Sequence, residues 1–431
     1  MADAPGKTLL VFSQVFRPDP ASVGQHMTDV AVGMARRGHR VLVYTSRRGY
    51  ENPSIRYPKR EVYEGVEIRR LSFAGFGKKN LLIRAFGTGM FMLQAIFLAL
   101  FTPRLKGIFF STSPPLIGFA AALAKIVRRV PIVYWAMDLN PDQLIAMGKI
   151  KERSAAARFL EWANRFILRR SDLIYALDRF MAQRLLQRGD LAKKMVIMPP
   201  WPHEGHMHTP SDQSTNPFRI QHGLAGKFVF MYSGNHSPAN PLKTLLDAAV
   251  RLKDRDDVRF VFVGGGLGKK EVEACIAQHQ LPNVLSLPYQ PIESLGESLS
   301  AADIHVVSMG DNMVGIIHPC KIYGAMAIGR PILYLGPRPS HIADILNQQS
   351  CGWQVRHGDV DGCLKALEAI LATDQTTRAA MGARAHAALQ ARYSQELLST
   401  RFCDALDALL RGRPFPTGDL LPPASVPPAT V

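Results

Sequence analysis

Residues 227–265 read KFVFMYSGNHSPANPLKTLLDAAVRLKDRDDVRFVFVGG, and this stretch decides the fold class of the chain. Two unbroken apolar runs, at 227–234 and 258–265, are typical of parallel strands that are buried on both faces. A helix that begins near Pro241 separates them. Strand, helix and strand in this order predict an α/β fold with a doubly wound parallel sheet.

The same alternation runs through both halves of the chain, whose 431 residues fit two domains better than one. Strand-like runs precede the quoted stretch at 7–13, 41–46, 64–71, 107–111, 131–137 and 171–177. Others follow it at 283–288, 303–310 and 331–337, with helices at about 360–372, 376–391 and 395–411. We therefore predict two similar α/β domains with a ligand-binding cleft at the carboxyl ends of their strands.

Local changes in composition indicate the boundaries of these domains. Pro199, Pro200 and Pro202 and the polar stretch after them indicate a linker, so we predict an N-terminal domain at 1–205 and a C-terminal domain at 217–391. A C-terminal helix at 392–411 follows. The last 20 residues, 412–431, hold six prolines without periodicity and are predicted to be a disordered tail.

Charge is concentrated in the first half of the chain. Residues 1–200 hold 32 basic and 14 acidic side chains, whereas the remainder holds 20 and 21, within a total charge of +17. Nucleic acid, an anionic membrane or a phosphorylated substrate could be the partner of such a surface. Five cysteines without a C-x-x-C pair, and an N-terminus that is unlike a signal peptide, favour a reducing, cytoplasmic location.

The most apolar segment is 81–101, and the stretch 85–103 carries no charged residue. Spanning a membrane would separate strand 107–111 from the strands of its own sheet, so we predict instead that the segment lies in the membrane interface. A buried domain helix is the alternative. The prediction of an interfacial segment rests on the basic residues that flank it, Lys78, Lys79, Arg84, Arg104 and Lys106. In that position the side chains of Phe91, Leu93, Ile96, Phe97 and Leu100 would insert into the membrane.

Two loops of the N-terminal domain could contact a substrate. Gly24 stands at an expected helix start, where backbone N–H groups could hold a phosphate or sugar, and the adjacent His26 could donate or accept a hydrogen bond. A simple turn is the alternative. Asp138 follows a strand and could contact an incoming hydroxyl, but Asp138 or Asn140 could instead cap a helix that has Pro141 in its first turn.

The C-terminal domain offers close backbone approaches to a phosphate. Ser233, Gly234 and Asn235 follow one strand, with Asn240 as an expected helix cap, and GGGLG at 264–268 follows the next. The second string lacks the dinucleotide spacing G-x-G-x-x-G, which argues against NAD.

The stretch 303–337 combines a strand, a loop and a helix that begins at Pro319. The loop holds Asp311, Gly315 and His318, and Lys321 stands in the first turn of the helix. A cation is unfavourable there unless a bound pyrophosphate accepts hydrogen bonds from it, which is the reading we prefer to a solvated surface lysine. The strings D-R-D at 254–256 and D-V-D at 359–361 match a metal-binding pattern, but we interpret them as solvated turns and predict no metal.

Together these pieces resemble glycosyltransferases of family 4, in the bacterial surface-polysaccharide and lipid-linked glycan branch. The resemblance rests on F-x-P-D-x-x-S-x-G, R-G-H-R-V, D-L-N-P-D, Y-S-G-N, F-V-G-G-G, S-A-A-D and P-C-K-I-Y-G-A-M-A-I-G-R-P-I-L and spans about residues 8–400. It implies a GT-B fold, with the nucleoside diphosphate sugar in the C-terminal domain and the acceptor in the N-terminal one. It also implies retention of the anomeric configuration, no cofactor and no required metal.

The resemblance also implies roles for residues of this chain. The catalytic candidates are Asp138, His26 and Asp311; the acceptor candidates are Gly24 and Gln25; the donor candidates are Gly234, Asn235, Gly265, Tyr289, Gly315, Ile316, His318 and Lys321. Tyr289 is expected beside the nucleotide base. The chain departs from the family pattern of two glutamates, because Ile316 and Gly324 occupy their places, and Asp311 could substitute for the first.

The predicted activity is therefore transfer of a hexose or N-acetylhexosamine to a lipid-linked or glycan acceptor at the inner face of the cell membrane. The expected partners are the donor, that acceptor and anionic lipid, and no nucleic acid. The missing glutamates motivate one alternative, a catalytically inactive GT-B scaffold. A nucleotide-sugar epimerase on the same fold is the other.

Overall fold

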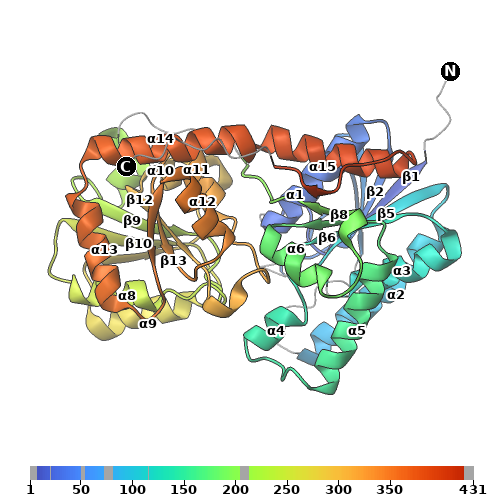
Figure 1. The fold of residues 1–431 in the computed structure, drawn as a ribbon, viewed down its shortest axis with the longest axis horizontal. Helices are drawn as coiled ribbons and strands as arrows, with labels where there is room; N and C mark the ends of the chain where they lie inside the picture. The colour runs from blue at the N-terminus through green and yellow to red at the C-terminus, as the bar shows by residue number, and fades with distance from the viewer. Residues whose placement is uncertain are drawn as a thin grey trace. The chain divides into compact units, whose positions relative to one another are not determined.

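The computed structural model describes residues 7–19, 21–49, 54–71, 81–114, 116–203 and 213–421. The chain divides into two compact units. Unit 1 contains residues 1–200, 315–318 and 396–421, and unit 2 contains residues 201–314 and 319–395. Each unit is built on a parallel sheet covered by helices, as the sequence predicts (Figure 1).

The described part of unit 1 holds a nine-stranded sheet in the order β15-β8-β7-β6-β5-β1-β2-β4-β3. Its strands are β1 (Thr8–Phe12), β2 (Arg40–Ser46), β3 (Arg60–Tyr63), β4 (Val66–Leu71), β5 (Leu105–Ser111), β6 (Ile132–Ala136), β7 (Leu173–Ala176), β8 (Met195–Ile197) and β15 (Gly418–Asp419). All neighbours are parallel except β3 and β4, which are antiparallel. Every residue of β1 is buried, which is why this strand reads as an unbroken apolar run.

Helices cover the sheet of unit 1 in two layers. They are α1 (Ser22–Arg36), α2 (Leu81–Phe101), α3 (Ile117–Arg128), α4 (Asp142–Ala146), α5 (Ala155–Arg170), α6 (Arg179–Leu186) and α15 (Gln395–Leu410). Successive side chains of a strand point to opposite faces. Phe110 of β5 accordingly packs toward Gly118 of α3, whereas its neighbour Phe109 contacts Phe402 of α15. In the layer that covers the Phe110 side of the sheet, α3 packs between α2 and α5.

Residues 85–101 of the segment 85–103 belong to α2, which packs on α3 and leads into β5. Because β5 pairs with β1, the prediction that strand 107–111 joins the same sheet is confirmed. Phe91 of α2 is 2% exposed and belongs to the core, so the prediction that it inserts into a membrane is wrong, whereas Leu93 and Phe97 are exposed. Among the helices that the structure describes, none combines the length and apolarity that crossing a bilayer requires.

The described part of unit 2 holds a six-stranded parallel sheet in the order β11-β10-β9-β12-β13-β14. Its strands are β9 (Phe228–Ser233), β10 (Val258–Val263), β11 (Val284–Leu287), β12 (Ile304–Ser308), β13 (Ile332–Leu335) and β14 (Gly352–Val355). Its helices are α7 (Pro217–Gln221), α8 (Lys243–Arg251), α9 (Lys269–His279), α10 (Leu295–Ser300), α11 (Lys321–Ala327), α12 (His341–Gln349), α13 (Val360–Ala372) and α14 (Gln375–Arg392). Side chains of β9, β10 and β12 form its core with α8 and α13.

Two predictions about helix and tail boundaries need correction. Asn240 does not cap α8, because that helix begins at Lys243 and Leu242 stands at its cap position. The predicted disordered tail is wrong in part, because Gly418–Asp419 form β15, which pairs with β8. Residues 422–431 lie outside the described residues, as do Lys78 and Lys79.

Candidate functional site

Two glycine-containing loops cross at the carboxyl ends of β9 and β10 in unit 2. We call residues 233–237 the β9 loop and residues 264–268 the β10 loop. The backbone N–H of His236 donates to the carbonyl oxygen of Gly265 at 2.7 Å, and the N–H of Gly268 donates to the carbonyl oxygen of His236 at 2.8 Å. These bonds hold the two loops together at the edge of the sheet where parallel α/β folds bind ligands.

Glycines are required where the loops cross. Gly264 has a φ of +130°, and a Cβ atom there would lie 2.1 Å from the carbonyl oxygen of Gly234. Gly266 has a φ of +117°, and its Cβ would lie 2.2 Å from Oδ1 of Asn235. Both positions therefore exclude a side chain on steric grounds as well as through their backbone angles. The glycines of F-V-G-G-G serve this backbone-to-backbone contact.

Lys321, the first residue of α11, reaches the β9 loop. A Cβ atom on Gly234, whose φ is +123°, would lie 2.9 Å from Cε of Lys321. The Lys321 ammonium lies 5.0 Å from the centre of the Tyr232 ring, which is the geometry of a cation–π contact. The hydroxyl of Tyr232 in turn donates to the carbonyl oxygen of Asn235 at 2.8 Å. The structure thus brings the donor candidates Gly234, Asn235 and Lys321 together.

Tyr289 and Lys269 border the β10 loop. Tyr289 follows β11 and is 43% exposed, and a Cβ atom on Gly265 would lie 2.9 Å from its Cε2. The Lys269 ammonium donates to the carbonyl oxygens of Gly264 at 2.8 Å and Leu287 at 2.5 Å. This lysine holds the loop in place. Its only signal in the sequence is that it breaks the dinucleotide spacing.

His236 is a residue that the sequence reasoning missed. Its side chain is 1% exposed and packs edge-on to Tyr232 with ring centres 5.0 Å apart, and neither ring nitrogen makes a hydrogen bond of regular geometry to a described residue. Burial, with smaller effects of the Lys321 and Lys269 charges, lowers its pKa from 6.5 to about 4. The imidazole is therefore neutral at physiological pH. The only signal in the sequence was a histidine directly after Y-S-G-N.

The remaining candidates from 311–318 are divided between the two units. Asp311 is exposed in the short turn Asp311–Met313 after β12. Gly315, Ile316 and His318 belong to unit 1, not to unit 2 with Lys321 as the prediction implied. A Cβ on Gly315 would lie 2.7 Å from the Phe180 backbone. Two polar contacts join them to unit 1: the Ile316 carbonyl oxygen accepts from the Leu139 N–H at 3.0 Å, and Nδ1 of His318 lies 2.7 Å from Oδ2 of Asp178.

The candidates near residue 24 lie inside α1 and not before it. The N–H groups of Gly24 and Gln25 both donate to the carbonyl oxygen of Ala21, at 2.9 and 3.2 Å, so they are engaged within the chain. The expectation that they hold a phosphate at a helix start is therefore wrong. Nδ1 of His26 lies 2.7 Å from the carbonyl oxygen of Ser22, and the ring is 2% exposed. His26 is thus a buried residue of α1.

Asp138 follows β6 at the carboxyl edge of the unit 1 sheet. It lines a small cavity of about 50 Å³ together with Asn140, Asn164 and Tyr134. Burial raises the pKa of Asp138 from 3.8 to about 6. The capping alternative is wrong, because Pro141 stands at the cap position of α4 and no side chain caps that helix. The position and the raised pKa suit a carboxylate that exchanges a proton with a bound hydroxyl.

Both D-x-D strings have structural roles in unit 2. Asp256 is hydrogen bonded by Lys227 at 2.7 Å and by Arg259 at 2.8 Å. Asp359 caps α13 by accepting from the N–H of Gly362 at 2.8 Å, and Asp361 pairs with Arg251. These carboxylates are already used by cations and by a helix terminus.

Comparison with known proteins places both units in one class. The glycosyl transferase 4-like domain matches residues 22–201, and the group 1 glycosyl transferase domain matches residues 227–373. WbjE of Pseudomonas aeruginosa, assigned as a glycosyltransferase, is 22% identical over 93% of this chain and 98% of its own. WcaI of Escherichia coli K12, assigned as a colanic acid biosynthesis glycosyl transferase, is 24% identical over 74% of this chain and 81% of its own.

Solved structures show the same fold. Sucrose-phosphate synthase of Thermosynechococcus elongatus aligns with a TM-score of 0.73 at 15% identity, over 94% of this chain and all of its own. Anabaena HepE in complex with UDP-glucose aligns with a TM-score of 0.67 at 16% identity, over 93% and 99%. The two α/β units and these neighbours define the GT-B fold. The chain belongs to glycosyltransferase family 4.

Proposed function

We propose that this glycosyltransferase moves a hexose or N-acetylhexosamine from a nucleoside diphosphate sugar to a lipid-linked or glycan precursor of a bacterial surface polysaccharide, with retention of the anomeric configuration. The observation that carries the proposal is the Lys321 ammonium held over the glycine-only crossing of the β9 and β10 loops. The names of WbjE and WcaI support the pathway, and the UDP-glucose bound to HepE supports the class of donor.

Lys321 would act on the leaving group. As the bond between the sugar and the diphosphate breaks, negative charge grows on the diphosphate oxygens, and an ammonium already in position stabilises that charge without reorganising. In a retaining reaction the acceptor oxygen forms its bond on the face that the diphosphate leaves. A diphosphate oxygen then takes the proton of the acceptor hydroxyl. Asp138 in unit 1 would orient that hydroxyl.

No metal and no further cofactor enters this scheme. The charge of the diphosphate is met by Lys321, and three of the four carboxylates of the D-x-D strings, those of Asp256, Asp359 and Asp361, are engaged with cations or a helix terminus. We further propose that the acceptor reaches the enzyme at the inner face of the cell membrane, where the basic first half of the chain would meet anionic lipid.

A panel of UDP-, GDP- and dTDP-sugars tests the donor site by thermal shift. A donor present at 100 times its Kd stabilises the fold by about 2.7 kcal/mol. Lys321→Ala should lose the shift, whereas Lys253→Ala, at an exposed lysine of the same unit, should keep it. NMR of the product would then give the anomeric configuration. A protein that binds donor but neither hydrolyses nor transfers it would instead be the inactive scaffold, and one that interconverts donor sugars without acceptor an epimerase.

A further inference from the structure

Exposed apolar side chains of unit 1 gather on one layer of helices. Seven of the ten large apolar side chains that are exposed in its described part lie on α2, α3 and α5. They are Leu93, Phe97 and Phe101 on α2, Ile126 and Val127 on α3, and Phe159 and Trp162 on α5. Because α3 packs between α2 and α5, these side chains belong to one face, which we call the α2–α3–α5 face (Figure 1). Apolar patches of this kind mark interaction surfaces.

Aromatic contacts order the part of this face that α5 supplies. The Trp162 ring lies 5.9 Å from that of Phe159 and 6.0 Å from that of Phe166, and the Phe119 ring of α3 lies 5.8 Å from it. Trp162 remains 53% exposed and Phe159 remains 55% exposed, although burial of both rings would be favourable. A fixed row of half-exposed aromatic rings is suited to the boundary between water and lipid, where tryptophan is enriched.

The charge around this face is mostly positive. Residues 68–137 contain ten lysines and arginines and no aspartate or glutamate. Among them Arg104 and Arg129 are exposed, and α5 adds the exposed Arg158 and Arg165. On α5 the one acidic residue, Glu161, is already paired with Arg165 and Arg188. A basic rim around an apolar surface complements an anionic bilayer and not an apolar, uncharged partner.

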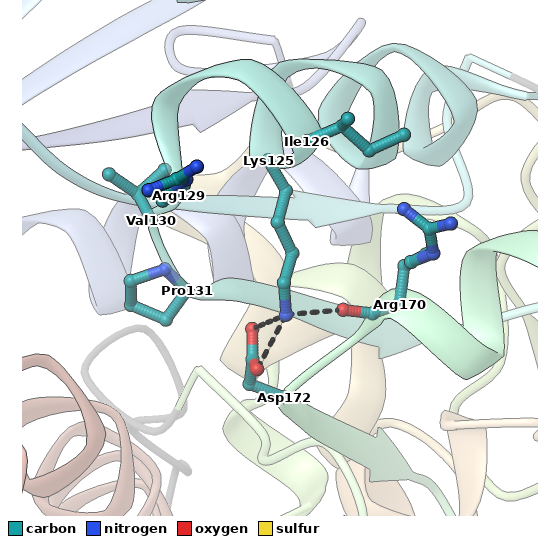
Figure 2. A pocket seen from close by; sticks show the side chains of 7 residues that line it. All are labelled: Lys125, Ile126, Arg129, Val130, Pro131, Arg170 and Asp172. Atoms are coloured by element: carbon teal, nitrogen blue, oxygen red, sulfur yellow. Dashed lines mark hydrogen bonds and ion pairs between the residues drawn. The ribbon is translucent and has the colours of Figure 1, made fainter.

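A cavity of about 550 Å³ lies at the carboxyl-terminal ends of α3 and α5. Ile126, Arg129 and Arg170 line it, and Figure 2 shows Lys125 passing between Pro131 and Arg170 to Asp172. The Lys125 ammonium donates to both carboxylate oxygens of Asp172 at 2.6 Å, which fixes the floor. Arg129 and Arg170 are exposed at the rim, the Arg170 guanidinium lying 5.1 Å from the centre of the Phe166 ring, and guanidinium groups are well suited to a phosphate.

We propose that the α2–α3–α5 face docks on an anionic bilayer, with Trp162, Phe159 and the apolar residues of α2 and α3 in the interface and a lipid phosphate between Arg129 and Arg170. The proposal goes beyond the membrane location proposed above, because it assigns the contact to three helices and a cavity of unit 1. It is independent of the donor site in unit 2.

Flotation of the full chain with vesicles tests this assignment. Vesicles of phosphatidylcholine mixed with an equal amount of phosphatidylglycerol should bind the protein, and phosphatidylcholine alone should bind it far less. The double variant Phe159→Ser and Trp162→Ser should weaken binding by at least about tenfold, and Arg129→Glu with Arg170→Glu should do the same in a salt-sensitive way. The matched controls Ile220→Ser and Lys253→Glu, at exposed positions of unit 2, should leave binding unchanged.

Tryptophan fluorescence locates the contact. Trp135 and Trp201 are at most 1% exposed and Trp353 is half-buried, so a blue shift on vesicle binding should come from Trp162. Trp162→Phe should keep the binding and lose the shift. Inorganic phosphate at the concentration of the lipid phosphate should not release the protein. Full release by phosphate would show a free-anion site and overturn the proposal.

Two other results would also overturn it: binding that survives both double variants, or a dimer in solution that Trp162→Ser converts to a monomer. Each variant is checked for a donor-induced thermal shift. Loss of vesicle binding with that shift intact concerns the docking face alone, whereas absence of the shift in the unaltered protein contradicts the proposed function and leaves the docking result standing.

Discussion

Gly234 and Lys321 are placed so that a methyl group on the first would lie 2.9 Å from Cε of the second. The lysine therefore occupies its position over the β9 loop because residue 234 has no side chain. The same glycine has a φ of +123°, which L-residues rarely adopt. One residue thus sets both the path of the loop and the place of the ammonium.

Gly234→Ala should therefore displace Lys321 and reduce kcat/KM, through steric contact as well as backbone strain. Gly223→Ala is the matched control, because Gly223 of the same unit also has a positive φ, +64°, but no atom within 4 Å of its added Cβ. We expect both variants to lose about 1 kcal/mol or more of stability and only the first to lose donor affinity. Steady-state kinetics with thermal unfolding separates the two effects, and equal losses of kcat/KM would refute the explanation.

Lys321→Ala should lower kcat/KM roughly ten- to more than hundredfold, because it removes a charge-assisted hydrogen bond to the departing diphosphate. This corresponds to a loss of about 1.5–3 kcal/mol of transition-state stabilisation. Lys321→Arg should recover part of the loss, since it keeps the charge. The comparison is made with UDP-, GDP- or dTDP-sugar, whichever shifts the unfolding temperature. Unchanged kinetics in Lys321→Ala would remove the assignment of this lysine.

Gly265→Ala tests the expected place of Tyr289 beside the nucleotide base. Gly265 does not have a positive φ, so the substitution adds only a Cβ atom 2.9 Å from Cε2 of Tyr289. The ring must move, and we expect KM for the donor to rise more than kcat falls. Tyr289→Ala should give the same change. If neither variant alters KM, Tyr289 lies away from the base.

The sheets could be predicted from the sequence more fully than the site. Unbroken apolar runs in the sequence predicted β1, β9 and β10, because parallel strands are buried on both faces. The hairpin of β3 and β4 was missed, since its turn residues Glu64 and Gly65 were read as part of a strand. Strand β15 has only two residues and lies in a proline-rich stretch. It forms because it pairs with β8, and no local sequence pattern predicts that pairing.

The site was predictable where chemistry is local and not where it depends on packing. Gly234 and Lys321 were found because a glycine after a strand and a cation at a helix start are unusual in themselves. His236 was missed because its importance comes from its burial, which only the folded chain shows. His318 was misplaced because its Asp178 partner is 140 residues away in the sequence. Gly24 was misread through a helix start that falls two residues earlier, at Ser22.

Activity should survive EDTA. In the proposed mechanism Lys321 meets the charge of the diphosphate, and three of the four carboxylates of the D-x-D strings already have partners within unit 2. Initial rates are measured with and without chelator, and again after addition of Mg²⁺ or Mn²⁺. Loss of turnover in EDTA that either ion restores would contradict the metal-free mechanism while leaving the family assignment intact.

Asp138 and His236 should give the two units opposite responses to pH. Burial raises the pKa of Asp138 from 3.8 to about 6, so the folded state binds more protons than the unfolded state between these values. Its contribution to stability is therefore lost as pH rises through about 6. Burial lowers the pKa of His236 from 6.5 to about 4, so the unfolded state binds more protons in that window, and stability falls as pH drops from 6.5 to 4.

Asp138→Asn and His236→Phe isolate these contributions. The stability of Asp138→Asn minus that of the unaltered protein should be more favourable at pH 8 than at pH 4. On acidification from pH 6.5 to pH 4, His236→Phe should lose less stability than the unaltered protein loses. Asp190→Asn, at an exposed carboxylate of unit 1, is the control for the first. For the second, His305 is the background, because its pKa is also lowered to about 4 by burial and it remains in the variant. Denaturant unfolding across this range measures each difference. If the loss of stability between pH 6.5 and pH 4 is the same with and without His236, the imidazole has a hydrogen-bond partner in solution and is not the neutral, buried group that this structure shows.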